Sequence, residues 1–193
     1  MSKIETILEY QELAARTCPD LPGEYENERH MNLGVITEIG EALDIFKKLL
    51  AYNKPVDVVN LGEELADISW YIINKCKFFG IPIEEDFSKV VQEVADLEKE
   101  NLFSEKALPA ELKSEALLTA VLTTYLSPVE NFFAAPIVQL AIFSNIATWY
   151  GLDYFQLLTN NIDKLKVRYP EKFTEEAAQN RDLEAERVEL EKK

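Results

Sequence analysis

The chain has 193 residues, 47% of them hydrophobic, and its 35 acidic residues outnumber its 20 basic ones to give a formal net charge of −15. This hydrophobic content is too high for an intrinsically disordered chain. The acidic excess argues against a nucleic-acid partner, because a phosphate backbone needs a basic surface. The same acidity permits binding of divalent cations and, through them, of phosphorylated small molecules.

Helices are the only regular structure that the sequence predicts. Glycine (6 residues) and proline (8 residues) are scarce for this length, and the apolar residues between them recur at spacings of three or four. The expected helices span residues 2–15, 28–52, 56–79, 83–101, 111–126, 136–150, 154–169 and 174–192. No stretch alternates apolar and polar residues convincingly, so the expected fold class is all-α, with no sheet.

The cysteines and the hydropathy indicate the compartment. Cys18 and Cys76 lack the spacing of a metal site and indicate free thiols in a reducing environment. No basic segment followed by an apolar run marks a signal peptide, and no apolar run reaches the roughly 18 residues of a membrane span. We therefore expect a cytoplasmic protein with no membrane partner.

A weak internal repeat relates residues 74–103 to residues 145–173. The aligned pairs are Asn74 and Asn145, Gly80 and Gly151, Phe87 and Phe155, and Leu97 and Leu165. We expect one domain over residues 1–193, in which residues 28–101 form a metal-carboxylate helical repeat. Residues 108–173 are either a degenerate second repeat or inserted helices, and residues 174–193 form a C-terminal helix.

Two pairs of acidic residues on consecutive helices carry the strongest chemical signal. Glu38 and Glu41 lie three residues apart on one expected helix, and Glu64 and Asp67 have the same spacing on the next. Residues i and i+3 share a helix face, so antiparallel neighbours can bring the four carboxylates together. Their neighbours are apolar, and a hard divalent cation offsets the cost of burying such acids. The pattern predicts a Mg²⁺ site, with Mn²⁺ as a substitute, although acidic pairs are also common on solvated helix faces.

The same region resembles MazG-like nucleoside triphosphate pyrophosphohydrolases. The resemblance lies in residues 30–48 (HMNLGVITEIGEALDIFKK), 52–55 (YNKP) and 63–71 (EELADISWY). The family pattern is Glu-x-x-Glu, a short connector and Glu-x-x-Asp, and the two acidic pairs match it. Many members carry a further glutamate just before the first motif residue, where this chain has Thr37.

A second region resembles the same family. Residues 161–173 (NIDKLKVRYPEKF) match an Asn-x-x-Lys-x-x-x-Arg-Tyr-Pro segment, and residues 180–187 (NRDLEAER) are typical of phage and bacterial relatives. Residues 83–150 intervene, where the short family layout has a direct connection. If the chain is a fused pseudo-dimer, the first copy keeps the four acids and the second keeps Asn161, Lys164 and Arg168, which together would form one composite site.

The resemblance implies a helical bundle of the all-α NTP pyrophosphatase type. It implies hydrolysis of (deoxy)nucleoside triphosphates to the monophosphate and pyrophosphate, for nucleotide pool control or house-cleaning. Four carboxylates are expected to hold the metal: Glu38, Glu41, Glu64 and Asp67. Either Glu38 or Glu41 is expected to be the catalytic base. Four further residues are expected to bind the substrate: Lys48, Asn161, Lys164 and Arg168.

Several alternatives stay open from the sequence. The chain could be a dUTPase or a phosphoribosyl-ATP pyrophosphohydrolase of the same superfamily, or an inactive helical module that binds a cation or a partner. Trp70 and Tyr71 either stack on a nucleobase or belong to the core, and His30 is expected to pack rather than to act as a base. Relatives of this type are oligomers, so we expect a homo-oligomer unless the chain is a fused pseudo-dimer.

Overall fold

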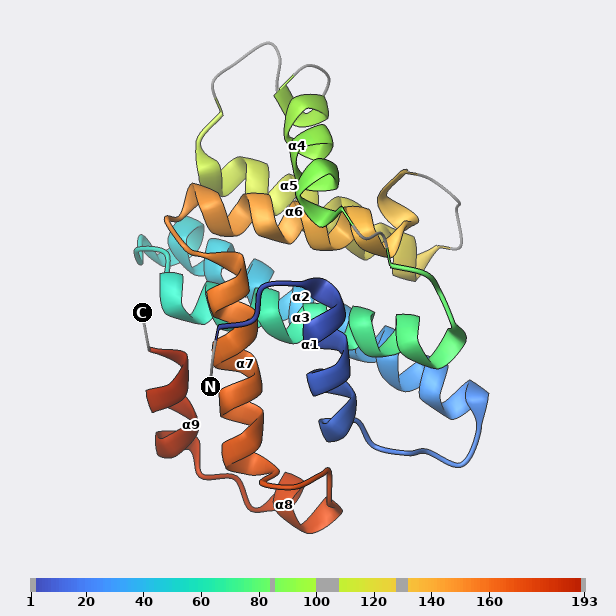
Figure 1. Cartoon of the computed structure of the whole chain (residues 1–193). Coiled ribbons are helices and arrows are strands. Elements are labelled where there is room, and N and C mark those ends of the chain that lie inside the picture. The colour runs from blue at the N-terminus through green and yellow to red at the C-terminus, as the bar shows by residue number, and fades with distance from the viewer. Residues whose placement is uncertain (1–2, 84–85, 100–107, 128–131, 192–193) are drawn as a thin grey trace.

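The computed structural model describes residues 3–83, 86–99, 108–127 and 132–191 (Figure 1). The helices in these ranges are α1 (Ile7–Ala14), α2 (Glu24–Tyr52), α3 (Val58–Phe79), α4 (Phe87–Leu97), α5 (Ala110–Leu126), α6 (Pro136–Trp149), α7 (Tyr154–Arg168), α8 (Glu175–Gln179) and α9 (Leu183–Leu190), with 3₁₀ turns η1 (Ala15–Thr17) and η3 (Phe132–Ala134). These residues contain no strand, which confirms the all-α fold class. None of the described helices is both long and apolar enough to cross a membrane.

Local capping explains how the first and the last expected helices differ from the helices of the structure. The helix expected from residue 2 begins at Ile7, because the Thr6 hydroxyl accepts a hydrogen bond from the Glu9 N–H at 3.1 Å. The helix expected at 174–192 is two short helices instead, because Thr174 caps α8 and Asp182 caps α9 across a break in the chain. The ends expected at residues 2, 101 and 192 lie outside the described residues.

The α2–α3 hairpin is the long structural element that positions the candidate site. Asn53 ends α2 in a left-handed conformation (φ 51°), and the Asp57 side chain starts α3 by accepting from the Asn60 N–H at 3.1 Å. The two helices approach closely at Gly34, where a Cβ atom would lie 2.2 Å from the Tyr71 ring. The short connector therefore gives antiparallel neighbours whose facing side chains are brought close together.

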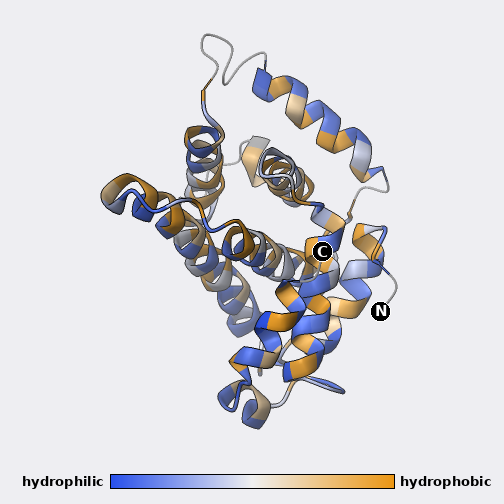
Figure 2. Cartoon of the chain, turned by 90° about the vertical axis from the view of Figure 1, so that its left-hand side faces the viewer, coloured by the Kyte–Doolittle hydropathy of each residue, from blue (hydrophilic) through white to orange (hydrophobic). Residues whose placement is uncertain are grey.

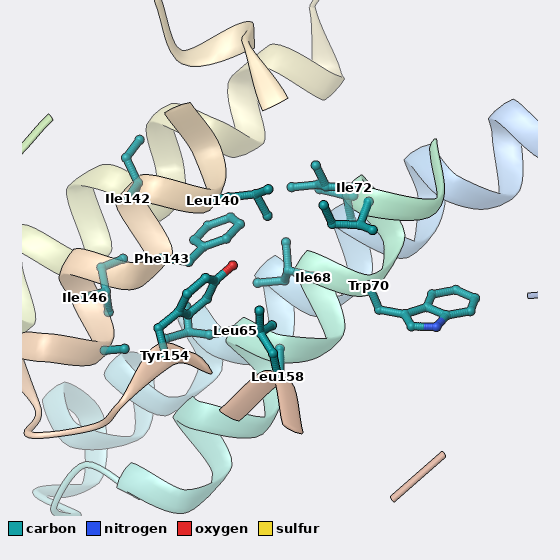
Figure 3. Close-up of a cluster of buried hydrophobic side chains, with 14 of the residues drawn as sticks. Leu65, Ile68, Trp70, Ile72, Leu140, Ile142, Phe143, Ile146, Tyr154 and Leu158 are labelled. Carbon is teal, nitrogen blue, oxygen red and sulfur yellow. The ribbon is translucent and has the colours of Figure 1, made fainter. Parts of the chain in front are cut away.

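The core lies mainly between α3, α6 and α7. α6 is apolar around most of its circumference, as expected of a fully buried helix. Figure 3 shows its side chains meeting those of the other two helices: Leu140, Phe143 and Ile146 from α6, Leu65, Ile68 and Ile72 from α3, and Tyr154 and Leu158 from α7. Trp70 also belongs to the buried core, and in the same view its ring projects from α3 away from the α6 side chains.

Helices α4 and α7 pack in a crossed arrangement. α4 follows α3 in the chain but packs on α6, whereas α7 follows α6 and packs extensively on α3. In addition, α2 packs on α5, and α3 packs on α6. Figure 2 shows hydrophobic and hydrophilic residues mixed along most of the helices, as expected of helices that bury one side and expose the other. The crossed packing places α7 beside the acidic residues of α3.

Candidate active site

A cleft of about 580 Å³ lies beside α2, α3 and the C-terminal end of α7. All four predicted metal ligands line it: Glu38, Glu41, Glu64 and Asp67. Its other lining residues include a fifth acid, two arginines and several aromatic side chains: Glu63, Arg168, Arg181, Trp70, Tyr71, Tyr169 and Phe173. The hairpin thus turns both acidic pairs toward a single hollow, as the helical spacing predicts.

Three of the carboxylates form a tight group. Glu38, Glu41 and Glu64 each offer an oxygen, and these oxygens lie within 4.8 Å of one another. Glu64 is buried, Glu38 is half-buried and Glu41 is exposed. Burial, and then the charge of Asp67, raise the pKa of both Glu38 and Glu64 above the ordinary carboxyl value. A cation bound by the three oxygens would offset both the cost of burial and the repulsion by Asp67.

Asp67 is held from behind by residues of α7. The Lys164 ammonium donates to both carboxylate oxygens of Asp67, at 2.8 and 2.6 Å, and lies 3.3 Å from Glu63. The Asn161 amide donates to the same carboxylate, and the Tyr10 hydroxyl donates to Asn161 at 2.9 Å. Burial lowers the pKa of Lys164, but the charges of Asp67 and Glu63 outweigh this and keep the pKa above its usual value. Lys164 is therefore a permanent cation beside the acids.

Asn161 and Lys164, which are expected to bind the substrate, both donate to Asp67 in the structure. Their exposed fractions are 0% and 1%, and neither lines the cleft. Asp67 lines the cleft and is bonded to both of them, so in this structure they reach the cleft through its carboxylate.

Lys48 is also placed differently from the expectation. Its ammonium pairs with Asp44 at 2.6 Å and half of its side chain is exposed. It lines a separate hollow beside the α2–α3 connector rather than the acidic cleft. The helical period explains the difference, because a residue seven positions after Glu41 shares its face but lies about 10 Å further along the axis.

Aromatic side chains lie at the other end of the cleft. Tyr71 comes seven residues after Glu64 on α3, about 10 Å along the helix. His30 on α2 meets Tyr71 edge to face, with ring centroids 5.6 Å apart, and Trp70 meets it at 4.9 Å. The Trp70 indole donates to the Thr17 hydroxyl at 3.0 Å. The cleft therefore joins an acidic end to an aromatic one.

Arg168, which is expected to bind the substrate, lines the cleft and has a partner that sequence reasoning did not identify. Glu186 of α9 accepts from the Arg168 guanidinium at 2.9 and 2.6 Å and from Arg181 at 2.8 Å. Arg181 and Glu186 lie in the NRDLEAER segment, which the sequence marks only as a resemblance. Glu63 was missed as well, although it adjoins Glu64.

Comparisons with family models, with curated proteins and with solved structures find no match for this chain. The chemistry of the site therefore has to be argued from its geometry.

Proposed function

We propose that the protein is a Mg²⁺-dependent hydrolase that converts nucleoside triphosphates to the monophosphate and pyrophosphate. The observation that carries the proposal is the convergence of Glu38, Glu41 and Glu64 within 4.8 Å, with Asp67 on the same wall, in a cleft that also has an aromatic end. The resemblance of the two acidic pairs to those of MazG-like enzymes supports the same activity.

The donor set fits a hard divalent cation. All of the converging donors are carboxylate oxygens, which select Mg²⁺ or Mn²⁺ over softer metals. The exposure of Glu41 leaves one side of the group open to solvent and substrate. When bound, Mg²⁺ would supply positive charge that offsets the acids and attracts phosphate oxygens.

The side chains of the protein provide proton transfer and positioning. Glu38 and Glu41 are less buried than Glu64, so one of them is placed to accept a proton from the attacking water. The water oxygen bonds to one phosphorus of the α–β bridge while the bond from that phosphorus to the bridging oxygen breaks. Pyrophosphate leaves with the bonding electron pair when the α-phosphorus is attacked, and the monophosphate leaves with it when the β-phosphorus is attacked. Lys164 and Asn161 hold Asp67 in place during this step.

The size and the aromatic end of the cleft suit a nucleotide. A volume of about 580 Å³ lies within the range of small-molecule sites. Tyr71 is partly exposed and lines the cleft about two helical turns from Glu64, where its ring offers surface for a flat base, and the buried Trp70 packs against it edge to face. A base at one end would place a phosphate chain near the acids at the other.

The direct test is pyrophosphate release from a panel of ribo- and deoxyribonucleoside triphosphates, with and without Mg²⁺. Wild-type protein should release pyrophosphate only when the metal is present. Glu41→Gln should reduce turnover by about 10²–10⁴-fold, the range for a lost catalytic proton acceptor. Asp44→Asn is the matched control, because Asp44 lies on the same helix and pairs with lysines outside the cleft.

Two results would oppose the proposal. One is a folded wild-type protein that releases no pyrophosphate from any nucleotide of the panel. The other is a Glu41→Gln variant that turns over substrate as fast as Asp44→Asn does.

A further inference from the structure

A buried carboxylate joins two arginines at the edge of the cleft. Glu186 accepts two hydrogen bonds from Arg168, at 2.9 and 2.6 Å, and one from Arg181, at 2.8 Å. Arg168 ends α7, Glu186 belongs to α9, and Arg181 lies in the segment between α8 and α9. Three parts of the C-terminal region therefore meet at one carboxylate.

The burial of the three side chains differs in a way that suggests separate roles. The Glu186 side chain is 3% exposed, Arg168 is 15% exposed and Arg181 is 41% exposed. Burial raises the pKa of Glu186, but the bonds from both arginines reverse the effect and lower it to about 2. At neutral pH the group therefore contains one anion and two cations, and its net charge is positive.

Both arginines line the cleft, whereas Glu186 does not. A guanidinium has five N–H groups, and Glu186 takes two from Arg168 and one from Arg181. Each arginine thus keeps donors beyond those that Glu186 uses. Guanidinium donors of this kind match phosphate oxygens in charge and shape.

The position of this group complements the acidic end. A nucleoside triphosphate remains an anion after it binds one divalent cation, so part of its phosphate chain needs a protein cation. Lys164 is buried behind Asp67 and Lys48 lies outside the cleft, so neither supplies one. Among the described residues that line the cleft, the lysine and arginine side chains are Arg168 and Arg181.

We infer that Arg181 is a further substrate-binding residue, which contacts phosphate oxygens of the polyphosphate chain, and that Glu186 is a positioning residue that holds Arg181 beside Arg168. This inference rests on the proposed function, because it names how the same site binds its substrate. It also assigns a task to the α8–α9 segment, which brings Arg181 to the cleft.

The test compares Arg181→Ala with Arg187→Ala, a control on α9 whose guanidinium pairs with Glu191 at 2.8 Å and which does not line the cleft. The readouts are KM and kcat for a triphosphate and the Kd of inorganic pyrophosphate, measured by calorimetry with Mg²⁺ present. Arg181→Ala should raise KM and the pyrophosphate Kd about tenfold, as expected for loss of a charge-assisted hydrogen bond. Its kcat should change by less than about threefold. Arg187→Ala should match wild type in KM, in kcat and in the pyrophosphate Kd.

Two further variants separate positioning from folding. Arg181→Lys keeps the charge but loses the planar fork, so it should recover part of the lost affinity. Glu186→Gln should raise KM more than it lowers kcat, and its melting temperature is recorded alongside. A lower melting temperature with an unchanged KM would show that Glu186 only ties α9 to α7, and would overturn its positioning role.

The outcomes distinguish this inference from the proposed function. If wild type hydrolyses triphosphates and Arg181→Ala binds pyrophosphate and substrate as tightly as wild type, the inference fails alone. If wild type hydrolyses no nucleotide, the proposed function fails, and calorimetry with pyrophosphate still decides whether Arg181 binds phosphate oxygens.

Discussion

Replacement of Lys164 by methionine tests the buried ion pair that organises the site. Lys164 is 1% exposed, and its ammonium lies 2.8 and 2.6 Å from the two oxygens of Asp67. Methionine fills most of the same volume, so the substitution removes the charge without opening a large cavity. Asp67 then keeps Asn161 as a donor but loses its cation, among acids that repel it.

The expected cost follows from the burial of the pair. Removal of one partner of a buried ion pair destabilises a protein by about 3–5 kcal/mol. Asp67 and Glu63 keep 23% and 19% exposure, which lets water relieve part of the penalty. We therefore expect the lower end, about 3 kcal/mol, which lowers the melting temperature by about 6–12 °C in a domain of this size.

The assay is urea unfolding at neutral pH in the presence of EDTA, so that metal binding does not contribute. Lys166→Met is the matched control, because Lys166 lies on the same helix, is 32% exposed and pairs with Asp163 at 3.5 Å. Its cost should stay below about 1 kcal/mol. In a double-mutant cycle, Asp67→Asn and Lys164→Met should show a coupling energy of about 1–3 kcal/mol.

The reasoning would be refuted by two observations. A Lys164→Met variant that unfolds at the same urea concentration as Lys166→Met would show that the charge is not needed for stability. A coupling energy near zero would show that Lys164 stabilises the fold without acting through Asp67.

Three other substitutions test the packing and the charges of the site. Gly34→Ala should cost about 1–2 kcal/mol in urea unfolding, because its Cβ would meet the Tyr71 ring, whereas Gly40→Ala on the same helix meets nothing and should stabilise by about 0.5–1 kcal/mol; equal effects would contradict the close approach. Burial and the neighbouring acids raise the pKa of Glu64 to about 9 in the fold, so the metal-free protein should lose stability as pH rises from about 4.5 toward 9. Glu64→Gln should flatten that slope and remove the stabilisation by Mg²⁺, and an unchanged slope would contradict this reasoning. Since the pKa of Glu186 is lowered to about 2, its contribution is complete above the ordinary carboxyl value and is lost as pH falls toward 2, so acid melts of Glu186→Gln should have a shallower limb than those of wild type.

Much of the hairpin could be predicted from local patterns. Helical periodicity alone places Glu38 with Glu41, and Glu64 with Asp67, because residues three apart share a face. The connector and the glycine after α3 mark helix ends through their own backbone preferences, as Asn53 and Gly80 show by their left-handed conformations. Thr6 and Asp182 cap the N-termini of α1 and α9, and both are residue types that favour this position. The helical periodicity of the sequence continues past both residues, so periodicity alone does not predict where these two helices begin.

The roles of the basic residues could not be predicted in the same way. Lys164 and Arg168 lie four residues apart on α7, yet one is buried behind Asp67 and the other lines the cleft. The difference depends on how α7 crosses α3 and on the contact between α7 and α9, which joins Arg168 to a carboxylate 18 residues away. Sequence spacing describes a helix face but not the neighbour that covers it.

Local pattern is therefore sufficient for the all-α class, for the hairpin and for the pairing of the four acids, because these depend on helix period and on backbone preferences within a few residues. The direction in which each basic side chain acts depends on packing between segments such as residues 63–67 and 161–164, which lie about a hundred positions apart. Only the folded chain decides that Lys164 supports a carboxylate and that Arg181 reaches the cleft, since burial and charge pairing are properties of surroundings that no single helix contains.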